Sequence, residues 1–97
     1  MNKAELVERL AQRTGVSLRE ARGSIDAIFD PDPSVGLIAA ELVRGEKVAI
    51  SGFGTFEARS RKARVGRNPH TGAALQIPAS RAPAFKPGKP LKETLRA

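Results

Sequence analysis

The chain has 97 residues and no cysteine, which excludes a disulfide scaffold, a thiolate zinc site and a cysteine nucleophile. Its single histidine also excludes a metal site built from several histidines. With 17 basic and 10 acidic residues the formal net charge is +7, which is typical of proteins that bind a polyanion such as DNA, RNA or an anionic membrane.

Two helices are predicted at the start of the chain. Asn2 can cap the first helix, whose apolar residues recur at helical spacing until Gly15 ends it. Ser17 and Glu20 form a capping box for a second helix, whose apolar period runs to Phe29. The chain therefore begins with two short amphipathic helices.

A proline-rich segment follows the second helix. The stretch Asp30–Pro33 is expected to break the helix, because proline lacks an N–H and restricts the residue before it. Asp32 can then cap a third helix with Pro33 at its first position. This third helix is expected to end at Gly45.

Beyond Gly45 the pattern changes from helix to strand. A short strand over Lys47–Ile50 and a tight turn over Ser51–Gly54 are expected first. An extended run from Thr55 to about Val65 and a turn cluster over 66–72 follow. The remaining elements expected are a strand over 74–79, a return to the core at Phe85 and a final helix over Pro90–Arg96.

The charge is distributed unevenly along a chain that is expected to form a single domain over 1–97. Residues 1–57 carry 7 basic and 9 acidic side chains, whereas residues 58–97 carry 10 basic and 1 acidic. This division predicts a near-neutral helical body with the first strands over 1–57 and a polyanion-binding surface beyond it. A solvated basic tail is the simpler alternative.

The segment 58–84 is expected to project as an arm. Its only leucine, isoleucine, valine or phenylalanine residues are Val65, Leu75 and Ile77, which are too few to form a core of their own. An isolated hairpin is only marginally stable in water. Residues 85–97 are expected to return to the body. Because so small a body has a thin core, its apolar surfaces are expected to complete their burial against a second copy.

Basic residues dominate this arm, and guanidinium groups on a hairpin can follow phosphates or enter a narrow minor groove. About six phosphate contacts would give a slope of log K against log salt of about −5. Strand alternation changes phase between Arg61 and Lys62, which predicts a twist or bulge there. The arm's basic residues are Arg59, Arg61, Lys62, Arg64, Arg67 and Arg81.

Three sequence strings carry a family resemblance. They are G-F-G-T-F at 52–56, G-R-N-P-H-T-G at 66–72 and F-K-P-G-K at 85–89. Together with the opening Met1–Leu6, they resemble the bacterial HU/IHF family of histone-like DNA-bending proteins, and HU most of all, over nearly the whole chain. The insertion-like segment Asp30–Gly36 departs from the family, whose second helix normally runs unbroken.

The resemblance implies an α+β fold with N-terminal helices, a three-stranded antiparallel sheet with a long protruding β-arm and a short C-terminal helix, in an intertwined dimer. It implies a nucleoid-associated protein whose arms bind the minor groove of double-stranded DNA, bending and compacting it largely without sequence specificity. The second chain would be identical or a paralogue. The DNA-binding residues expected are Arg59, Arg61, Lys62, Arg64, Arg67, Asn68, Pro69, Arg81, Lys86, Lys89 and Lys3.

Pro69 has two interpretations. The resemblance implies that it is the intercalating residue, since the proline of the family's R-N-P string wedges between base pairs. Without the resemblance, Asn68–Pro69 simply begins a turn with proline at its favoured second position. For Lys3, Lys86 and Lys89, a place on the ordinary protein surface is the alternative to contact with flanking phosphates.

Two other function classes fit parts of the sequence. Thr14–Ser17 lies between two helices as in a sequence-specific helix-turn-helix regulator, but Glu20 and Asp26 on the recognition helix would oppose DNA. A basic RNA-binding structural module is the other alternative, although the chain has few aromatic residues for stacking. Neither an enzyme nor a cofactor or metal is expected, because clustered carboxylates, a nucleophile motif and a P-loop are missing from the sequence.

A membrane partner is not expected either. The chain's first residues lack the apolar core of a signal peptide. The longest apolar stretch, Leu37–Ala40, is far shorter than the roughly 20 residues that span a bilayer. These features predict a cytoplasmic protein.

Overall fold

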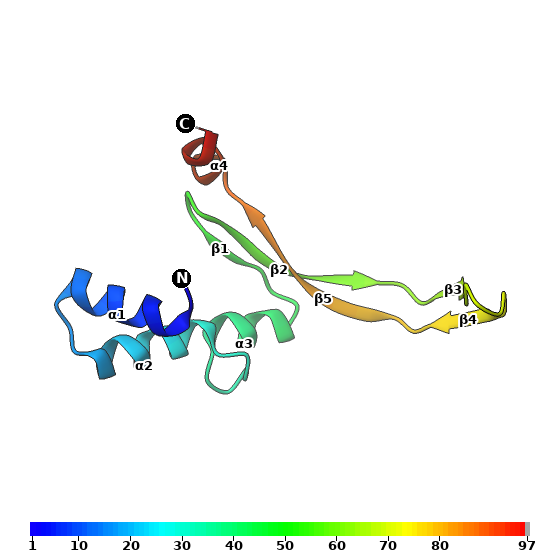
Figure 1. Cartoon of the computed structure of the whole chain (residues 1–97), viewed down its shortest axis with the longest axis horizontal. Helices are drawn as coiled ribbons and strands as arrows, with labels where there is room; N and C mark the ends of the chain where they lie inside the picture. The colour runs from blue at the N-terminus through cyan, green and yellow to red at the C-terminus, as the bar shows by residue number, and fades with distance from the viewer. Residues whose placement is uncertain (97) are drawn as a thin grey trace. The chain divides into compact units, whose positions relative to one another are not determined.

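Figure 1 shows the computed structural model of the chain, which describes residues 1–96. The fold is α+β, as predicted, with helices at the start, strands in the middle and a helix at the end. The chain forms two compact units, which are Met1–Arg44 and the part from Gly45 onward. No helix in the described part is both long and apolar enough to cross a membrane.

Helix α1 spans Lys3–Thr14 and begins as predicted. The side-chain Oδ1 of Asn2 accepts a hydrogen bond from the backbone N–H of Glu5 at 2.9 Å, which satisfies one of the free donors at the helix start. Gly15 ends the helix in the left-handed region at φ 77°, a conformation that costs glycine nothing.

Helix α2 spans Leu18–Phe29, and its cap is also as predicted. Ser17 Oγ accepts from the backbone N–H of Glu20 at 3.1 Å. The helix ends before Asp30, immediately ahead of the first proline of the segment that was expected to break it.

Helix α3 spans Leu37–Val43 with Gly36 as its N-cap, so the predicted cap at Asp32 and first position at Pro33 are wrong. Asp32 Oδ1 instead accepts from the backbone N–H of Ser34 at 2.9 Å and from its hydroxyl at 2.7 Å, which closes a separate turn before the helix. Gly36 then stands at the helix start, where a Cβ would lie 1.9 Å from the carbonyl oxygen of Asp30. The chain can pass this point only because Gly36 has no side chain.

The first unit buries little apolar surface. Its core consists of Val7, Ala11, Ala21 and Ile25, with Leu6 and Leu10 packed against it. Other large apolar residues of these helices stay open, including Leu37 at 65%, Leu18 at 58%, Val43 at 54% and Phe29 at 53% exposure. A single copy therefore leaves much of its apolar surface in water.

The second unit is built on a three-stranded antiparallel sheet in the order β1-β2-β5. Its strands are β1 (Val48–Ile50), β2 (Gly54–Arg61) and β5 (Ser80–Pro87). Helix α4 (Lys89–Arg96) follows β5, as the sequence predicted. The sheet and the final helix are thus the expected elements in the expected order.

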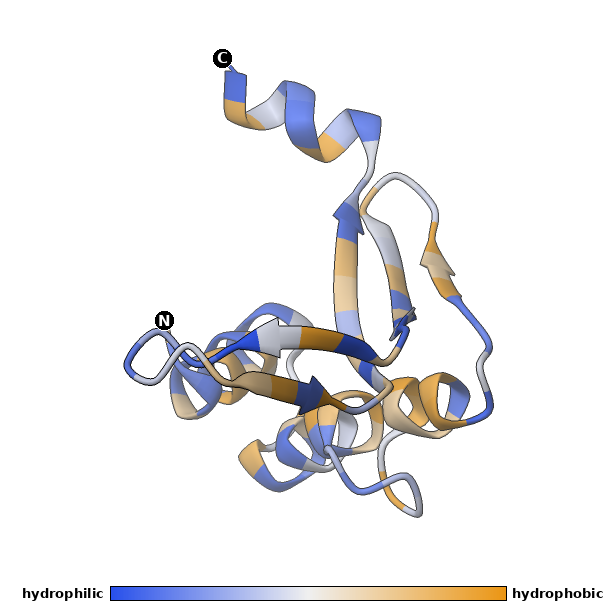
Figure 2. Cartoon of the chain, turned by 90° about the vertical axis from the view of Figure 1, so that its right-hand side faces the viewer, coloured by the Kyte–Doolittle hydropathy of each residue, from blue (hydrophilic) through white to orange (hydrophobic). Residues whose placement is uncertain are grey.

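One face of this sheet is apolar. The register places Phe56 opposite Phe85 on one side and opposite Val48 on the other, and the two phenylalanine ring centroids are 4.8 Å apart. Gly54 allows this packing, since a Cβ there would lie 2.6 Å from the Phe85 ring. In Figure 2 β1 is coloured almost wholly as hydrophobic. Ile50, at 49% exposure, shows that this apolar surface too remains open in one chain.

Beyond the sheet, β2 and β5 continue into a second antiparallel pair and form one long hairpin, the arm (Figure 1). The outer pair is β3 (Arg64–Arg67) and β4 (Ala74–Ile77). Strand pairing stops at residues 62–63 and again at 78–79 across the hairpin, so the predicted extended run from Thr55 divides into β2 and β3, and the predicted strand over 74–79 ends at Ile77. Pro78 cannot donate a ladder hydrogen bond, and the break begins where the charge pattern changes phase.

Candidate nucleic-acid interface

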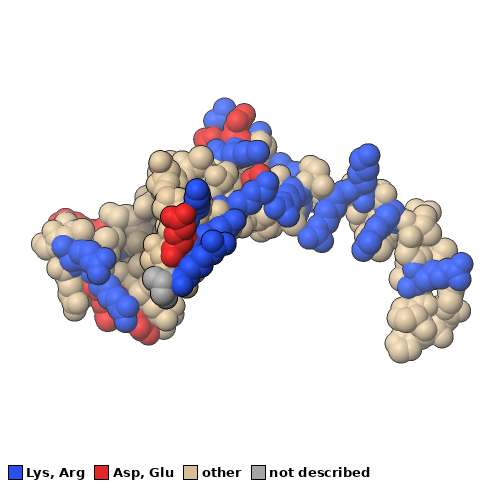
Figure 3. All heavy atoms as spheres, turned by 90° about the horizontal axis from the view of Figure 1, so that it is seen from above, with Lys and Arg blue, Asp and Glu red and all other residues tan. Residues whose placement is uncertain are grey.

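Basic side chains line the arm along its length, as Figure 3 shows. Four of them have no carboxylate within ion-pair distance among the residues that the structure describes: Arg61, Lys62, Arg64 and Arg67. All four side chains are exposed, so they are available to an external anion. Arg81 is exposed as well.

The cations lie on both faces of the hairpin. Arg59 and Arg61 share one face of β2, whereas Arg81 pairs with Ser60 and therefore lies on the opposite face. In β3, Arg64 and Arg67 also point to opposite faces, since they are three positions apart on an alternating strand. A hairpin with cations on both faces can contact both phosphate walls of a groove.

A hydrogen-bonded turn forms the arm tip. Asn68 and Ala73 close it through an N–H to carbonyl bond of 2.8 Å, and Gly72 N–H donates to the Asn68 carbonyl at 2.8 Å. Asn68 Oδ1 also accepts from the backbone N–H of His70 at 2.9 Å. The turn interpretation of Asn68–Pro69 is therefore confirmed, and Pro69 itself is exposed at the tip.

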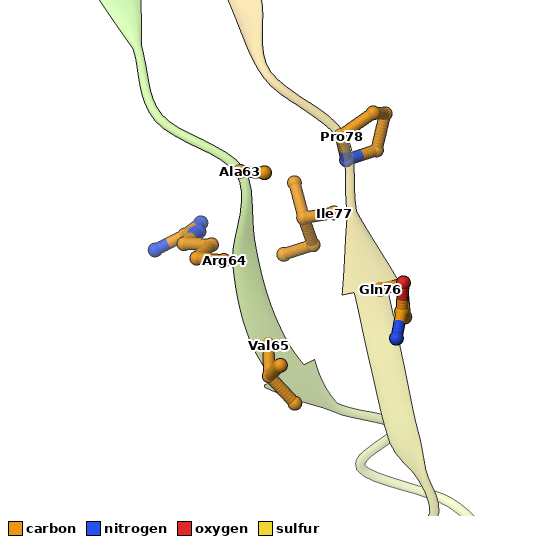
Figure 4. Close-up of a pocket in the computed structure, with 6 residues that line it drawn as sticks. All are labelled: Ala63, Arg64, Val65, Gln76, Ile77 and Pro78. Atoms are coloured by element: carbon orange, nitrogen blue, oxygen red, sulfur yellow. The ribbon is translucent and has the colours of Figure 1, made fainter.

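An open pocket of about 260 Å³ lies where the arm's two strand pairs meet. In Figure 4 Ala63 and Ile77 point toward each other between the strands, while Arg64 points away. The lining contains no carboxylate, imidazole or hydroxyl group, so it offers nothing for acid–base or metal chemistry. Its residues are Ala63, Arg64, Val65, Gln76, Ile77 and Pro78.

Glu57 gathers cations at the base of the arm. Its Oε1 accepts from Arg59 Nε at 3.2 Å and lies 3.2 Å from Lys86 Nζ, and its Oε2 lies 3.5 Å from Lys47 Nζ. The residue is only 7% exposed. The hydrogen bonds from Arg59 and then Lys86 hold the pKa of Glu57 below its ordinary value. Sequence reasoning missed this role, although strand alternation places positions 57 and 59 on one face.

The three lysines predicted to flank the DNA each have an acidic neighbour. Lys3 Nζ lies 2.5 Å from Asp26 Oδ1, and Lys89 Nζ lies 4.0 Å from Glu93 Oε1. Lys86 belongs to the Glu57 cluster. Lys3 is part of the first unit, whereas the other predicted DNA-binding residues all belong to the second.

The described residues contain no metal site. No three histidine, cysteine, aspartate or glutamate side chains among them lie close enough together to hold a metal ion. The described side chains of the arm and the sheet offer charge, hydrogen bonding and apolar contact. All three are properties of a binding surface.

Comparisons with known proteins agree over the whole length. The family model described as "Bacterial DNA-binding protein" matches residues 1–96. The SPbeta prophage-derived DNA-binding protein HU 2 of Bacillus subtilis (strain 168) is 50% identical over 97 residues, covering 100% of this chain and 99% of that protein. DNA-binding protein HU of Geobacillus stearothermophilus is 48% identical over 96 residues, covering 99% of this chain and 100% of that protein.

Solved structures are similar as well. One is the Anabaena HU–DNA cocrystal structure, with a TM-score of 0.81, 41% identity and coverage of 98% of this chain and 97% of that chain. Another is HU from Thermotoga maritima, with a TM-score of 0.64, 33% identity and coverage of 98% of both chains. The similarity thus includes the arm as well as the helices and the sheet.

Proposed function

Because the chain belongs to the HU family of bacterial DNA-binding proteins, we propose that it is an architectural protein that binds, bends and compacts duplex DNA with little sequence preference. The observation that carries this proposal is the arm, a long hairpin with exposed cations on both faces and an exposed proline at its tip. It would act in the cytoplasm, on nucleoid DNA, and it would need neither cofactor nor catalytic residue.

The arm is suited to the minor groove. Negative potential concentrates in a narrow groove, where guanidinium groups neutralise phosphates on either side and release counterions. Arg61, Arg64 and Arg67 supply exposed guanidinium groups along the hairpin. Contacts of this kind go to phosphate and sugar, so they position the protein without reading the bases.

Pro69 is proposed as the wedge. A proline has no backbone N–H to strip of water, and its ring is rigid and apolar, so inserting it between base pairs costs mainly their unstacking, a few kcal/mol per step. The hydrogen bonds of Asn68 with Ala73 and His70 fix the turn that presents it. A kink at this step would let more of the arm follow the DNA.

The proposed assembly is a homodimer that forms one intertwined domain, with a paralogous chain as the alternative partner. Support comes from apolar side chains that one copy leaves open in both units, such as Phe29 and Leu37 in the first and Ile50 in the second. Burying such side chains stabilises a protein by about 25 cal/mol per Å². A second copy would complete both cores and supply a second arm.

Binding measurements test the proposal. We expect the protein to bind short duplexes of unrelated sequence with similar affinity, and the affinity to fall steeply between about 0.05 and 0.3 M salt. Strong preference for one sequence would favour the helix-turn-helix regulator, and equal or tighter binding to double-stranded RNA would favour the RNA-binding module. Either result would overturn the proposal.

A further inference from the structure

Glu57 is the only acidic residue between Glu46 and Glu93, and it lies beneath three cations at the base of the arm. We infer that this carboxylate competes with DNA phosphates for Arg59, Lys86 and Lys47, and so weakens DNA binding and makes it less dependent on salt. The inference rests on the proposed function, since it concerns how the same surface engages duplex DNA.

The cations reach Glu57 from β2, from β5 and from the residue just before β1. Lys47 directly precedes β1, Arg59 follows Glu57 by two residues on β2, and Lys86 lies on β5 opposite Thr55. Strand alternation puts all of them on the polar face, away from the rings of Phe56 and Phe85. The cluster is therefore one patch on one face.

Within the cluster, the carboxylate is buried and the cations are exposed. The side chain of Glu57 is only 9% exposed, whereas those of Lys47, Arg59 and Lys86 are 68%, 57% and 58% exposed. The cations thus form the outer layer and the carboxylate the inner one. An approaching phosphate meets the cations first and does not have to displace Glu57 from its position.

Competition follows from this layering. The three cations are more than half exposed and stand on flexible stems, so each can turn from the Glu57 carboxylate to a phosphate of the highly charged duplex. The carboxylate stays behind them and cancels one of the three positive charges. The patch therefore presents a net charge of about +2 rather than +3, by the Coulomb balance of one anion against three cations at contact distance.

The replacement Glu57→Gln removes the charge and keeps the shape and one acceptor oxygen. If one more phosphate is then neutralised, the slope of log K against log salt becomes steeper by about 0.9. Because this electrostatic term fades toward 1 M salt, the same change makes binding at 0.1 M salt about eightfold tighter. Glu8→Gln is the matched control, since Glu8 is an exposed acid of α1 and loses the same charge.

The experiment measures affinity for one labelled duplex of mixed sequence across a salt series, for wild type, Glu57→Gln and Glu8→Gln, with circular dichroism to check folding. We expect tighter and steeper binding for Glu57→Gln alone. An unchanged or weaker affinity with an unchanged slope would overturn the inference while leaving the proposed function intact. Failure of the wild type to bind DNA would instead overturn the proposed function.

A second measurement needs no variant. Carboxyl NMR of wild-type protein labelled at glutamate follows the titration of Glu57 with and without duplex DNA. We expect DNA to raise the pKa of Glu57, because phosphates draw the cations away and add negative charge nearby. A pKa that stays the same in the complex would show that the cations keep their pairing with Glu57, and would contradict the inference.

Discussion

Asn68 Oδ1 accepts the backbone N–H of His70 at 2.9 Å, so the asparagine side chain spans Pro69 and fixes the turn at the arm tip. The arrangement gives Asn68 a structural task besides the DNA contact expected of it. It also means that the exposed proline ring is presented by a turn with defined hydrogen bonds. The proposed wedge thus has a rigid support at the end of an otherwise thin hairpin.

Replacing Pro69 tests the wedge. Pro69→Ala should fold normally and bind duplex DNA, yet bend it less, because alanine has neither the ring nor the fixed φ to hold a base step open. The bend is measured by energy transfer between dyes at the two duplex ends. Pro31→Ala, an exposed proline in the first unit, is the control. An unchanged bend with Pro69→Ala would remove the wedge from the account.

The arm cations should set the salt dependence of binding. Replacing Arg61 and Arg64 together by glutamine removes two phosphate contacts, so the slope of log K against log salt should become shallower by about 1.8 per chain. Arg22→Gln, on the exposed surface of α2, should leave the slope nearly unchanged. If the two variants changed the slope equally, the salt dependence would come from the net charge of the protein and not from the arm.

Glu57 should also give the fold a defined pH dependence. Its pKa in the folded protein lies below the usual 4.5 because of Arg59 and then Lys86. A group with a lowered folded-state pKa stabilises the fold fully above its unfolded-state pKa, and this stabilisation is lost as pH falls through the folded-state value. The difference in melting temperature between wild type and Glu57→Gln should therefore stay constant from about pH 7 to 5 and shrink toward about pH 3. A difference that grows in acid would contradict the assigned ion pairs.

Two glycines should respond to alanine in opposite ways. Gly54→Ala should destabilise the fold by about 1–3 kcal/mol, because the added Cβ would lie 2.6 Å from Phe85 ring atoms and from the Lys86 carbonyl oxygen. Gly23→Ala, inside α2 with no atom within 4 Å of the added Cβ, should stabilise it by about 0.5–1 kcal/mol. Chemical denaturation measures both changes. Tolerance of alanine at position 54 would show that the sheet packs differently.

The sequence was sufficient where a local rule decides the structure. Asn2 and Ser17 carry the side chains that cap a helix, and each caps its helix as predicted. The same rule failed at Asp32. Its side chain could either cap a helix or close a turn with Ser34, and in the structure it closes the turn. Helix α3 begins after Gly36, where the chain passes close to the Asp30 backbone. This close approach cannot be read from the sequence.

The sequence predicted which residues form the proposed binding surface, but not which of them contact one another. The run of cations from Arg59 to Arg81 is evident from the sequence, and its placement on a hairpin followed from the turn at Asn68–Pro69. The Glu57 cluster was not foreseen, because it depends on Lys86 lying beside β2 through a pairing distant in the chain. The break at Pro78 likewise appears only when both strands are placed side by side.

The most direct test of the central claim is energy transfer across a mixed-sequence duplex saturated with the wild-type protein. The account predicts that the duplex ends approach each other on binding, and that they do so on several unrelated sequences. Binding with no change in end-to-end distance would contradict it, because the protein would then neutralise DNA without bending it.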